Sequence, residues 1–377
     1  MFRDNTAGLN IGDPTYIPKI NANRDKLFFI GIEWQNRLSP NNLRSVTVPT
    51  AAQRSGDFSR TTEADGRPVF IRHPLSSLPC ATNSGGGCFP GNIIPASRIS
   101  RDGQKILNFY PQPNVPIDRQ FNDLTQVSDT FPRRENICRG DYNINDKWRF
   151  YSRFIKTRSE QDRAYGQWNA DYNIPFVPMN FGNPGWSWVN NLTTTINPTL
   201  TNEFIFGSSK NVLNIDRVDK TFDRSKLGLD YKMLFSGDTL GLVQNWRFGG
   251  VPNAPFTGFN GTPFRNFNNT FDITDNVIKI KGNHTMKFGI SLQRSRKDQT
   301  AFTSVNGVIW FDRNSQNPGN TNWAFSNALL GNFDRLAQSN KVQNGQYRSW
   351  NVEWFAQDNW RITKKSYSRL RYALLLD

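Results

Sequence analysis

Alternation of apolar and polar residues at a period of two recurs along the chain and constrains its fold more than any other feature. The clearest cases lie at 26–37, 147–156 and 284–293. Successive side chains of a β-strand point to opposite faces, so this period predicts strands with one apolar and one polar face. An aromatic content of 13% also favours β-structure. We expect about ten strands, at 7–17, 26–37, 135–144, 147–158, 186–196, 200–210, 271–280, 284–295, 347–360 and 366–376.

The connections between these segments alternate in length. Short turns rich in Asn, Asp, Gly, Pro, Thr and Lys join strand pairs, at 145–147, 197–199, 281–284 and 363–365. Long polar stretches separate the resulting hairpins, at about 38–133, 159–185, 213–270 and 298–345. If successive strands run antiparallel, all the short turns fall at one end of a sheet and all the long connections fall at the other.

This asymmetry is typical of outer-membrane β-barrels, which have short periplasmic turns, long extracellular loops and strands of about ten residues. Charged residues within the strands fit the same plan, because they would face a wet lumen rather than a packed core. Candidate lumen-facing residues are Glu33, Arg149, Tyr151, Arg153, Glu203 and Lys287. Candidate lipid-facing and girdle residues are Phe28, Ile30, Trp34, Trp148, Phe150, Phe154, Phe288 and Trp360.

A secreted or surface β-rich binding protein without a membrane span is the alternative. A sandwich or propeller would give the same alternation and turns. Four structure-poor loops of this length on one side are uncommon in a compact domain. No repeat of fixed period is visible either, which counts further against a propeller.

Several other function classes find no support in the sequence. The net charge of +15 can indicate nucleic acid, an anionic membrane surface or acidic ligands. Lys and Arg are scattered along the whole chain without a nucleic-acid-binding motif, so we expect no nucleic-acid partner. His73 and His284 are the only histidines, and their placement suits no Ser-His-Asp or Cys-His site. The Gly-rich stretch 84–88 lacks the Gly-Lys-Ser/Thr of a phosphate loop. We therefore predict no enzyme activity, no cofactor and no metal site.

The cysteines leave one question open. Cys80 and Cys88 bracket a short Gly-rich loop, and they could form a disulfide in an oxidising compartment or remain free thiols. A metal site would need more ligands, and only His73 is close in sequence. Cys138 is expected to pack as a small residue within a strand.

The longest connection, 38–133, carries signals of local structure. Thr50 and Gln53 form a T-x-x-Q capping box, and Gly56 supplies a stop at the other end of the turn. Further along, 95–114 has apolar residues close to helical spacing before a proline. We expect an ordered loop with short helices.

Ten motifs occur in a fixed order. The first five are RDKLFFIGIEW, VPTAAQRSGDFS, GRPVFIRHPL, FPGNIIPASRI and LNFYPQPN. The next five are DYNINDKWRFYSRF, INPTLTNEFIFG, GNHTMKFGISL, FSNALLGNF and WFAQDNWRITKK. The ordered set covers nearly the whole chain and resembles the early barrel of Oar-like TonB-dependent outer-membrane receptors of the acidobacterial type.

The resemblance implies a barrel of roughly 22 strands, an N-terminal plug and a preceding carboxypeptidase-regulatory-like domain. Receptors of this kind import bulky ligands with energy delivered through TonB. Compared with such receptors, we expect this sequence to lack a signal peptide, a TonB box, a plug and the regulatory domain, and to end within the barrel at RLRYALLLD. It also departs from the family at Asp13, in place of a glycine, and at His73, in place of the usual Asp.

We therefore expect an all-β chain that forms a partial antiparallel transmembrane β-barrel, about ten of roughly 22 strands, in the outer membrane. Residues 1–37 would form the first barrel hairpin, 38–133 a long ordered extracellular loop, and 134–377 the further hairpins. The chain would be a truncated or fragmentary part of the receptor, not competent for transport alone. Expected partners are outer-membrane lipid, lipopolysaccharide bound by loop arginines and an unknown bulky ligand. TonB would act only through the missing plug region.

Overall fold

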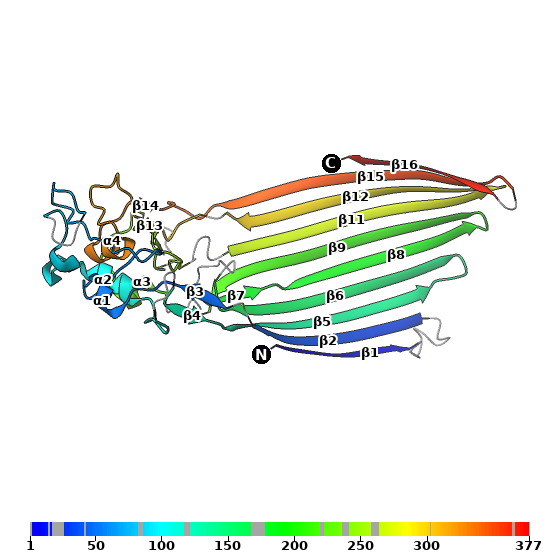
Figure 1. Cartoon of the computed structure of the whole chain (residues 1–377). Helices are drawn as coiled ribbons and strands as arrows, with labels where there is room; N and C mark the ends of the chain where they lie inside the picture. The colour runs from blue at the N-terminus through cyan, green and yellow to red at the C-terminus, as the bar shows by residue number, and fades with distance from the viewer. Residues whose placement is uncertain are drawn as a thin grey trace.

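A computed structural model describes residues 2–13, 16, 26–40, 43–81, 86–116, 121–166, 178–218, 222–235, 241–257, 264–301, 303–363 and 366–376. In these residues one antiparallel sheet contains ten long strands that lie side by side (Figure 1). From one edge to the other they are β1 (Arg3–Asp13), β2 (Lys26–Pro40), β5 (Ser128–Asn143), β6 (Trp148–Arg163), β8 (Gly185–Asn197), β9 (Leu200–Arg217), β11 (Phe264–Lys281), β12 (His284–Thr300), β15 (Asn344–Arg361) and β16 (Tyr367–Leu376). The short β7 (Met179–Gly182) pairs with β6 and β9, the same neighbours as β8.

Cross-strand pairs explain why these segments form strands. Ile30 lies opposite Ile11, and Phe154 lies opposite Trp188, so apolar side chains meet on one face. On the other face Thr274 lies opposite Ser291, and their hydroxyls are 3.1 Å apart. Matched pairs of this kind stabilise a sheet and set its register. The prediction of an all-β antiparallel sheet is confirmed.

The short turns and the long connections lie at opposite ends of the sheet, as predicted (Figure 1). The strands, however, extend beyond their predicted bounds toward the long connections. β5 begins at Ser128 rather than at 135, and β12 continues to Thr300 rather than 295. The long loop predicted at 38–133 therefore spans 41–127. Backbone hydrogen bonds continue past the apolar part of each strand, where hydropathy gives no signal. The first strand is also displaced, to Arg3–Asp13 from the predicted 7–17.

The long connections pack together into one unit, which we call the loop domain: the described residues within 41–127, 164–184, 218–263 and 301–343, apart from β7. Its helices are α1 (Ala51–Arg54), α2 (Arg101–Asn108), α3 (Arg224–Leu227) and α4 (Ala324–Leu330), with 3-10 turns η1 (Pro90–Asn92) and η2 (Ala96–Arg98). β3 (Arg44–Val46) pairs with β4 (Asp123–Thr125). β10 (Asn245–Arg247), β13 (Val308–Trp310) and β14 (Arg335–Ala337) form a small sheet. No helix in the described part of the chain is long and apolar enough to cross a membrane.

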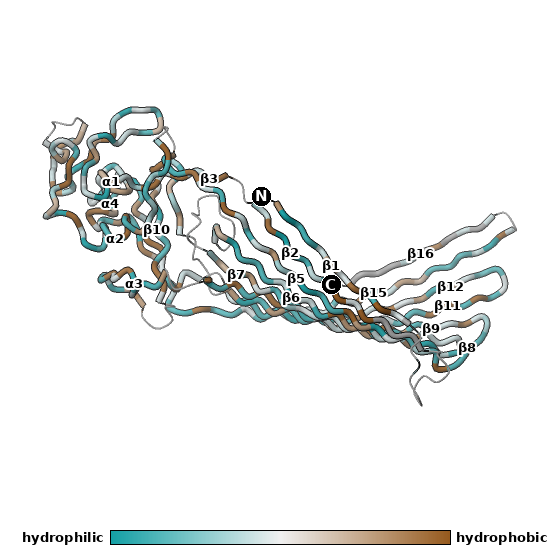
Figure 2. Tube along the Cα trace, turned by 90° about the horizontal axis from the view of Figure 1, so that it is seen from below, coloured by the Kyte–Doolittle hydropathy of each residue, from teal (hydrophilic) through white to brown (hydrophobic). Residues whose placement is uncertain are grey.

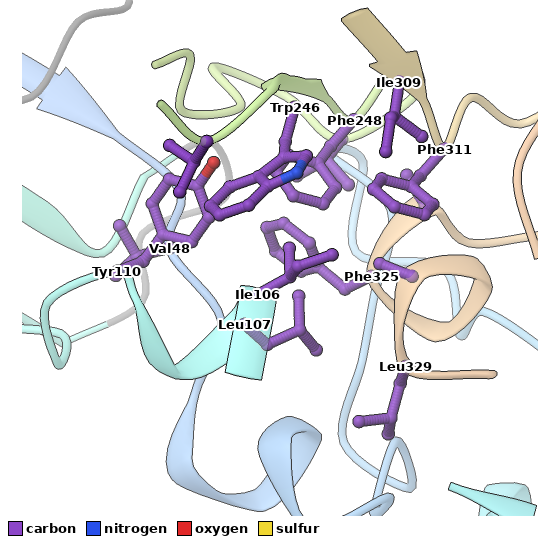
Figure 3. Close-up of a cluster of buried hydrophobic side chains, with 14 of the residues drawn as sticks. Val48, Ile106, Leu107, Tyr110, Trp246, Phe248, Ile309, Phe311, Phe325 and Leu329 are labelled. Carbon is purple, nitrogen blue, oxygen red and sulfur yellow. The ribbon is translucent and has the colours of Figure 1, made fainter. Parts of the chain in front are cut away.

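The hydrophobic core lies mainly in the loop domain rather than in the large sheet. Side chains from three of its connections converge there (Figure 3), among them Val48, Ile106, Leu107, Tyr110, Trp246, Phe248, Ile309, Phe311, Phe325 and Leu329. Aromatic rings meet edge to face within this core; the ring centroids of Phe248 and Phe325 are 5.0 Å apart. The long connections are therefore held by burial of apolar surface, to which Ile215 of β9 and Phe264 of β11 contribute from the end of the large sheet.

The helix signals in the first connection are largely confirmed. The Thr50 hydroxyl accepts a hydrogen bond from the Gln53 amide, and the Gln53 side chain accepts one from the Thr50 amide, which completes the capping box. Gly56 follows with φ +95°, a conformation that favours glycine. The second helix is shorter than the segment 95–114, at Arg101–Asn108. Helix α4 was not predicted, because its seven residues include Ser and Asn and are too few to show a helical period.

Candidate functional surfaces of the sheet and the loop domain

Two faces of the large sheet differ in chemistry. Apolar and polar residues alternate along much of the coloured part of the strands (Figure 2). The strand register brings the alternate residues of all ten strands onto common faces. We call the face that contains Ile30, Phe154 and Phe288 the apolar face, and the face that contains Glu33, Arg153 and Lys287 the polar face.

Each set of predicted strand residues falls on a single face. The register places all the candidate lumen residues on the polar face: Glu33, Arg149, Tyr151, Arg153, Glu203 and Lys287. It places the candidate lipid and girdle residues on the apolar face: Ile30, Trp34, Trp148, Phe150, Phe154, Phe288 and Trp360. Phe28 pairs with Gly140 at the matching register position, and its side chain lies outside the described part of the structure. The assignment of the two faces to lumen and lipid stays a prediction.

Hydrogen-bonded groups of side chains cover the polar face. Arg139 forms a 2.7 Å ion pair with Asp141, and its guanidinium lies 4.5 Å from the ring centroid of Tyr151. Glu203 accepts hydrogen bonds from Asn191 at 2.8 Å and from Asn276 at 3.3 Å. Of the predicted residues, Tyr151 and Glu203 are therefore part of these groups. Glu33, Arg149, Arg153 and Lys287 form no ion pair with any described residue.

The apolar face has the height expected of a membrane-spanning band. Trp350 and Trp360 lie on this face of β15 and are ten residues apart in its sequence. That separation corresponds to about 34 Å along a strand. At the usual strand tilt it is about 25 Å along a membrane normal, which is the height of the apolar band of outer-membrane barrels. Asp275 is an exception within this band, and Asn202 donates a hydrogen bond to its carboxylate.

Arg54 joins two parts of the first connection in the loop domain. Its guanidinium donates hydrogen bonds to the carbonyl oxygens of Pro49, Tyr110 and Pro111, at distances from 2.6 to 3.0 Å. Its side chain is buried, and burial lowers the pKa of its guanidinium. Arg54 thus fixes the end of α1 against the segment that follows α2. Sequence reasoning missed this role, because a single Arg in a polar stretch looks like a solvated residue.

A cavity of about 470 Å³ opens in the loop domain beside α1. Hydroxyl, amide and charged side chains line much of it, including Thr50, Asp57, Ser59, Arg60 and Asn122. Trp323 also lines the cavity and is 3% exposed, and its Nε1 has no hydrogen-bond partner among the described residues. The cavity has the size of a small-molecule site, with polar groups in its wall.

The loop domain contains two further features of note. Cys80 and Cys88 are joined by a disulfide, with their Cα atoms 4.8 Å apart. Asp123 is buried on β4, its Oδ2 lacks a hydrogen-bond partner in the described residues, and desolvation raises the pKa of its carboxyl. Cys138, by contrast, is exposed on the apolar face of the sheet, so the expectation that it packs in a strand is wrong. It is paired with Ile30 and Phe154, and these side chains do not cover its thiol.

Comparison with known families decides the class of protein. The sequence matches the family described as an outer membrane beta barrel domain over residues 1–365. The chain belongs to this family. As a member of the outer membrane beta barrel domain family it is located in an outer membrane, so the alternative of a secreted or surface protein without a membrane span is set aside.

Solved structures with a similar arrangement include two outer-membrane proteins of Escherichia coli. One is the outer membrane transporter YddB, with a TM-score of 0.44 and 8% sequence identity. The other is the ferric-catecholate import receptor Fiu; its open form has a TM-score of 0.43 and 10% identity, and its closed form a TM-score of 0.41 and 11% identity. These matches cover 99%, 99% and 98% of this outer membrane beta barrel domain chain, but only 34%, 46% and 43% of the solved chains. The chain therefore spans less than half of their length. No curated protein matches it.

Proposed function

We propose that the chain is part of the β-barrel of an Oar-like TonB-dependent receptor, which imports a bulky ligand across the outer membrane. The observation that carries the proposal is the loop domain. Its long connections share one hydrophobic core at one end of the sheet, with Phe248 from one connection packed on Phe325 from another. A barrel that served only as a membrane anchor would need its strands and short connections, but not a folded unit of this size at one rim. The ordered motifs that resemble Oar-like receptors support the same reading.

The proposed orientation follows from the two faces of the sheet and from the lengths of the connections at its two ends. The apolar face would contact lipid, and the polar face would line a hydrated lumen. The loop domain would lie outside the cell, and the short turns, such as 144–147, would lie in the periplasm. Lipopolysaccharide and membrane lipid would then surround the outer rim, and TonB would act through the plug region of the receptor.

The sheet itself suggests that further strands complete the barrel. Within the described residues β1 pairs only with β2, and β16 pairs only with β15. Open sheet edges leave backbone N–H and C=O groups without partners, at a cost of several kcal/mol for each group in lipid. We therefore propose that these ten strands form one part of a wider barrel and do not make a transport-competent pore alone.

Growth on limiting nutrients tests the import function. A strain that produces the protein, its deletion mutant and a strain without TonB would be grown on a panel of iron chelates, cobalamins and oligosaccharides. We expect at least one nutrient for which the deletion mutant and the TonB-deficient strain fail in the same way, with recovery when the gene is restored. A growth defect of the deletion mutant that loss of TonB does not reproduce would rule out TonB-dependent import.

The orientation has a separate test on intact cells. Single cysteines would replace Arg98 in the loop domain or Asp146 in a short turn, in a Cys138→Ser background, because Cys138 is the free thiol of the described chain. Both positions are exposed. A membrane-impermeant maleimide should label the first without treatment and the second only after the outer membrane is opened. The reverse pattern would invert the proposed orientation.

A further inference from the structure

Cations gather on the apolar face of the sheet, near the loop domain. We call this group the cation belt; it comprises Arg134, Lys156, Arg158, Lys210, Arg294, Arg296 and Arg348. Four of them lie in one continuous cross-strand row, which runs in pairing order through Lys156, Trp186, Lys210, Asn269, Arg296 and Arg348. Because directly paired residues lie side by side on one face, these charges follow one line across six strands, at right angles to the strand direction.

The belt lies next to aromatic residues at one edge of the apolar band. Arg348 is two residues beyond Trp350 on the same face of β15, and Arg294 lies over the Trp350 ring at 5.0 Å from its centroid. Two residues advance a strand by about 7 Å. Arg296 and Arg348 are therefore just outside the aromatic edge of the apolar band, on the side of the loop domain. At the other end of the belt, Arg134 is paired directly with Trp34, a predicted girdle residue, and so lies at the same aromatic edge. In an outer-membrane barrel with the proposed orientation, this is the headgroup level of the outer leaflet.

Two pairs of arginines lie directly opposite each other in the belt. Arg134 pairs with Arg158, and Arg296 pairs with Arg348. Like charges at directly opposed positions destabilise a sheet. Neighbouring carboxylates neutralise one member of each pair: Glu160 contacts Arg158 at 2.5 Å, and Asp298 contacts Arg348 at 2.6 Å.

The other member of each pair lacks such compensation. Arg134 donates a hydrogen bond to the Asn136 side chain, and neither Arg134 nor Arg296 has a carboxylate partner among the described residues. Both side chains are exposed. The remaining carboxylates of this face at this end, Asp162 and Asp216, contact Asn180 and Arg265 instead. The belt thus retains a surplus of positive charge that an external anion would neutralise.

A hollow of about 470 Å³ lies at one end of the belt. Its wall includes Ala7, Trp34, Asn36, Pro132, Arg134 and Arg158. The Arg134 guanidinium lies 5.7 Å from the centroid of the Trp34 ring. Glu160 also lines the hollow and is paired with Arg158, so Arg134 is the guanidinium of this wall without a carboxylate partner among the described residues. An apolar floor beside this guanidinium suits a ligand with an acyl or sugar portion and a phosphate, because guanidinium binds phosphate oxygens in a bidentate manner.

From these observations we propose that the cation belt binds the phosphate groups of lipopolysaccharide in the outer leaflet. The inference rests on the proposed orientation of the barrel, and it adds a lipid site on the strands to the ligand role of the loops. Arg134 and Arg296 provide the unneutralised charge, and the hollow beside Trp34 accommodates the glycolipid backbone of one molecule. Bound phosphate offsets the repulsion within both arginine pairs.

The unaltered protein gives the first test. The complete natural polypeptide would be extracted from outer membranes and placed in nanodiscs that contain lipid A or lipid A without phosphates. We expect retention of lipid A that falls steeply with salt, because exposed charges are screened at higher ionic strength, and little retention of the dephosphorylated form. Equal retention of both forms, or retention insensitive to salt, would overturn the proposal. Phosphatidylglycerol in place of lipid A shows whether any anionic lipid suffices; equal binding would exclude a site specific for lipopolysaccharide.

Charge variants locate the site. The double variant Arg134→Gln/Arg296→Gln should bind lipid A roughly thirtyfold more weakly, given the usual contribution of a cation near an anionic membrane surface. The matched control Arg149→Gln/Arg153→Gln removes the same charge from the polar face and should bind normally. Unchanged binding by the first variant, or equal loss in the control, would contradict the assignment. Heat-modifiable migration of each sample reports insertion of the barrel separately, so this test does not depend on whether the receptor imports anything.

Discussion

The guanidinium of Arg54 donates a 3.0 Å hydrogen bond to the carbonyl oxygen of Tyr110, 56 residues further along the chain. Further hydrogen bonds reach Pro49 at 2.9 and 3.0 Å and Pro111 at 2.6 Å. No acidic group of the described residues takes part. Backbone carbonyl dipoles hold a buried cation here, and the cation in turn supplies hydrogen-bond donors to the carbonyl just before α1 and to two carbonyls just after α2.

Replacement of Arg54 by Met should therefore loosen the first connection. The change removes the hydrogen bonds that the guanidinium donates to the carbonyl oxygens of Pro49, Tyr110 and Pro111, which we expect to lower the stability of the loop domain by about 3 kcal/mol. Hydrogen exchange measured by mass spectrometry would show faster exchange in α1 and in the segment after α2. Arg98→Met is the control, since Arg98 is exposed and should leave exchange unchanged. Unaltered exchange in the Arg54 variant would show that its hydrogen bonds contribute nothing.

The buried carboxyl of Asp123 predicts that the stability of the loop domain depends on pH. Its carboxyl is buried and its pKa is raised by desolvation, so the folded state binds this proton more tightly than the unfolded state does. Its contribution to stability is therefore fully present below the unfolded pKa of about 3.9 and is lost as the pH rises through the folded pKa. Asp123→Asn should stabilise the loop domain at pH 7, and this advantage should shrink as the pH falls.

Asp57 supplies a control of opposite sign. Its carboxylate accepts a 2.9 Å hydrogen bond from the Ser59 amide, and hydrogen bonds from Ser59 lower its pKa. Its contribution is present above the unfolded pKa and is lost as the pH falls through the folded one. Asp57→Asn should thus give no stabilisation at pH 7. Guanidinium-induced unfolding followed by limited proteolysis of the loop domain, across a range of pH, would measure both variants. If the stability of the two variants changed with pH in the same way, the raised pKa of Asp123 would be refuted.

Gly103 lies where the backbones of α2 and α4 approach closely. A Cβ at this position would lie 2.0 Å from the carbonyl oxygen of Ala328, which is backbone and cannot rotate away. Ala is the better helix former by about 1 kcal/mol, so the sign of the effect separates packing from propensity. Gly103→Ala should destabilise the loop domain by about 2 kcal/mol through overpacking. Asn108→Ala, on the exposed side of the same helix, should be neutral or slightly stabilising by the same unfolding measurement.

The contrast between strands and loops shows what the sequence could reveal. The ten strands were predictable because a period of two and the turn residues are local signals. The face on which Phe288 or Arg153 lies follows from its odd or even position along the strand alone. The loop domain was not, because its core joins residues far apart in sequence, such as Gly103 and Ala328. The cation belt was predictable only in part. The alternation along each strand assigns Arg296 and Arg348 to its apolar face, but only the register between strands shows that the two are opposite each other.

Two substitutions on β12, three residues apart and on opposite faces, test which face contacts lipid. Phe288 lies on the apolar face and is 46% exposed, whereas Ser291 lies on the polar face opposite Glu353. Phe288→Arg should lower the stability of the inserted barrel by about 2–4 kcal/mol, the usual cost of an arginine at the midplane on the lipid face. Ser291→Arg should cost little, because its guanidinium would meet water and the Glu353 carboxylate. Urea-dependent folding into phospholipid vesicles, followed by heat-modifiable migration, would measure both. A larger loss for Ser291→Arg than for Phe288→Arg would reverse the two faces, and with them the position of the cation belt relative to the lipid.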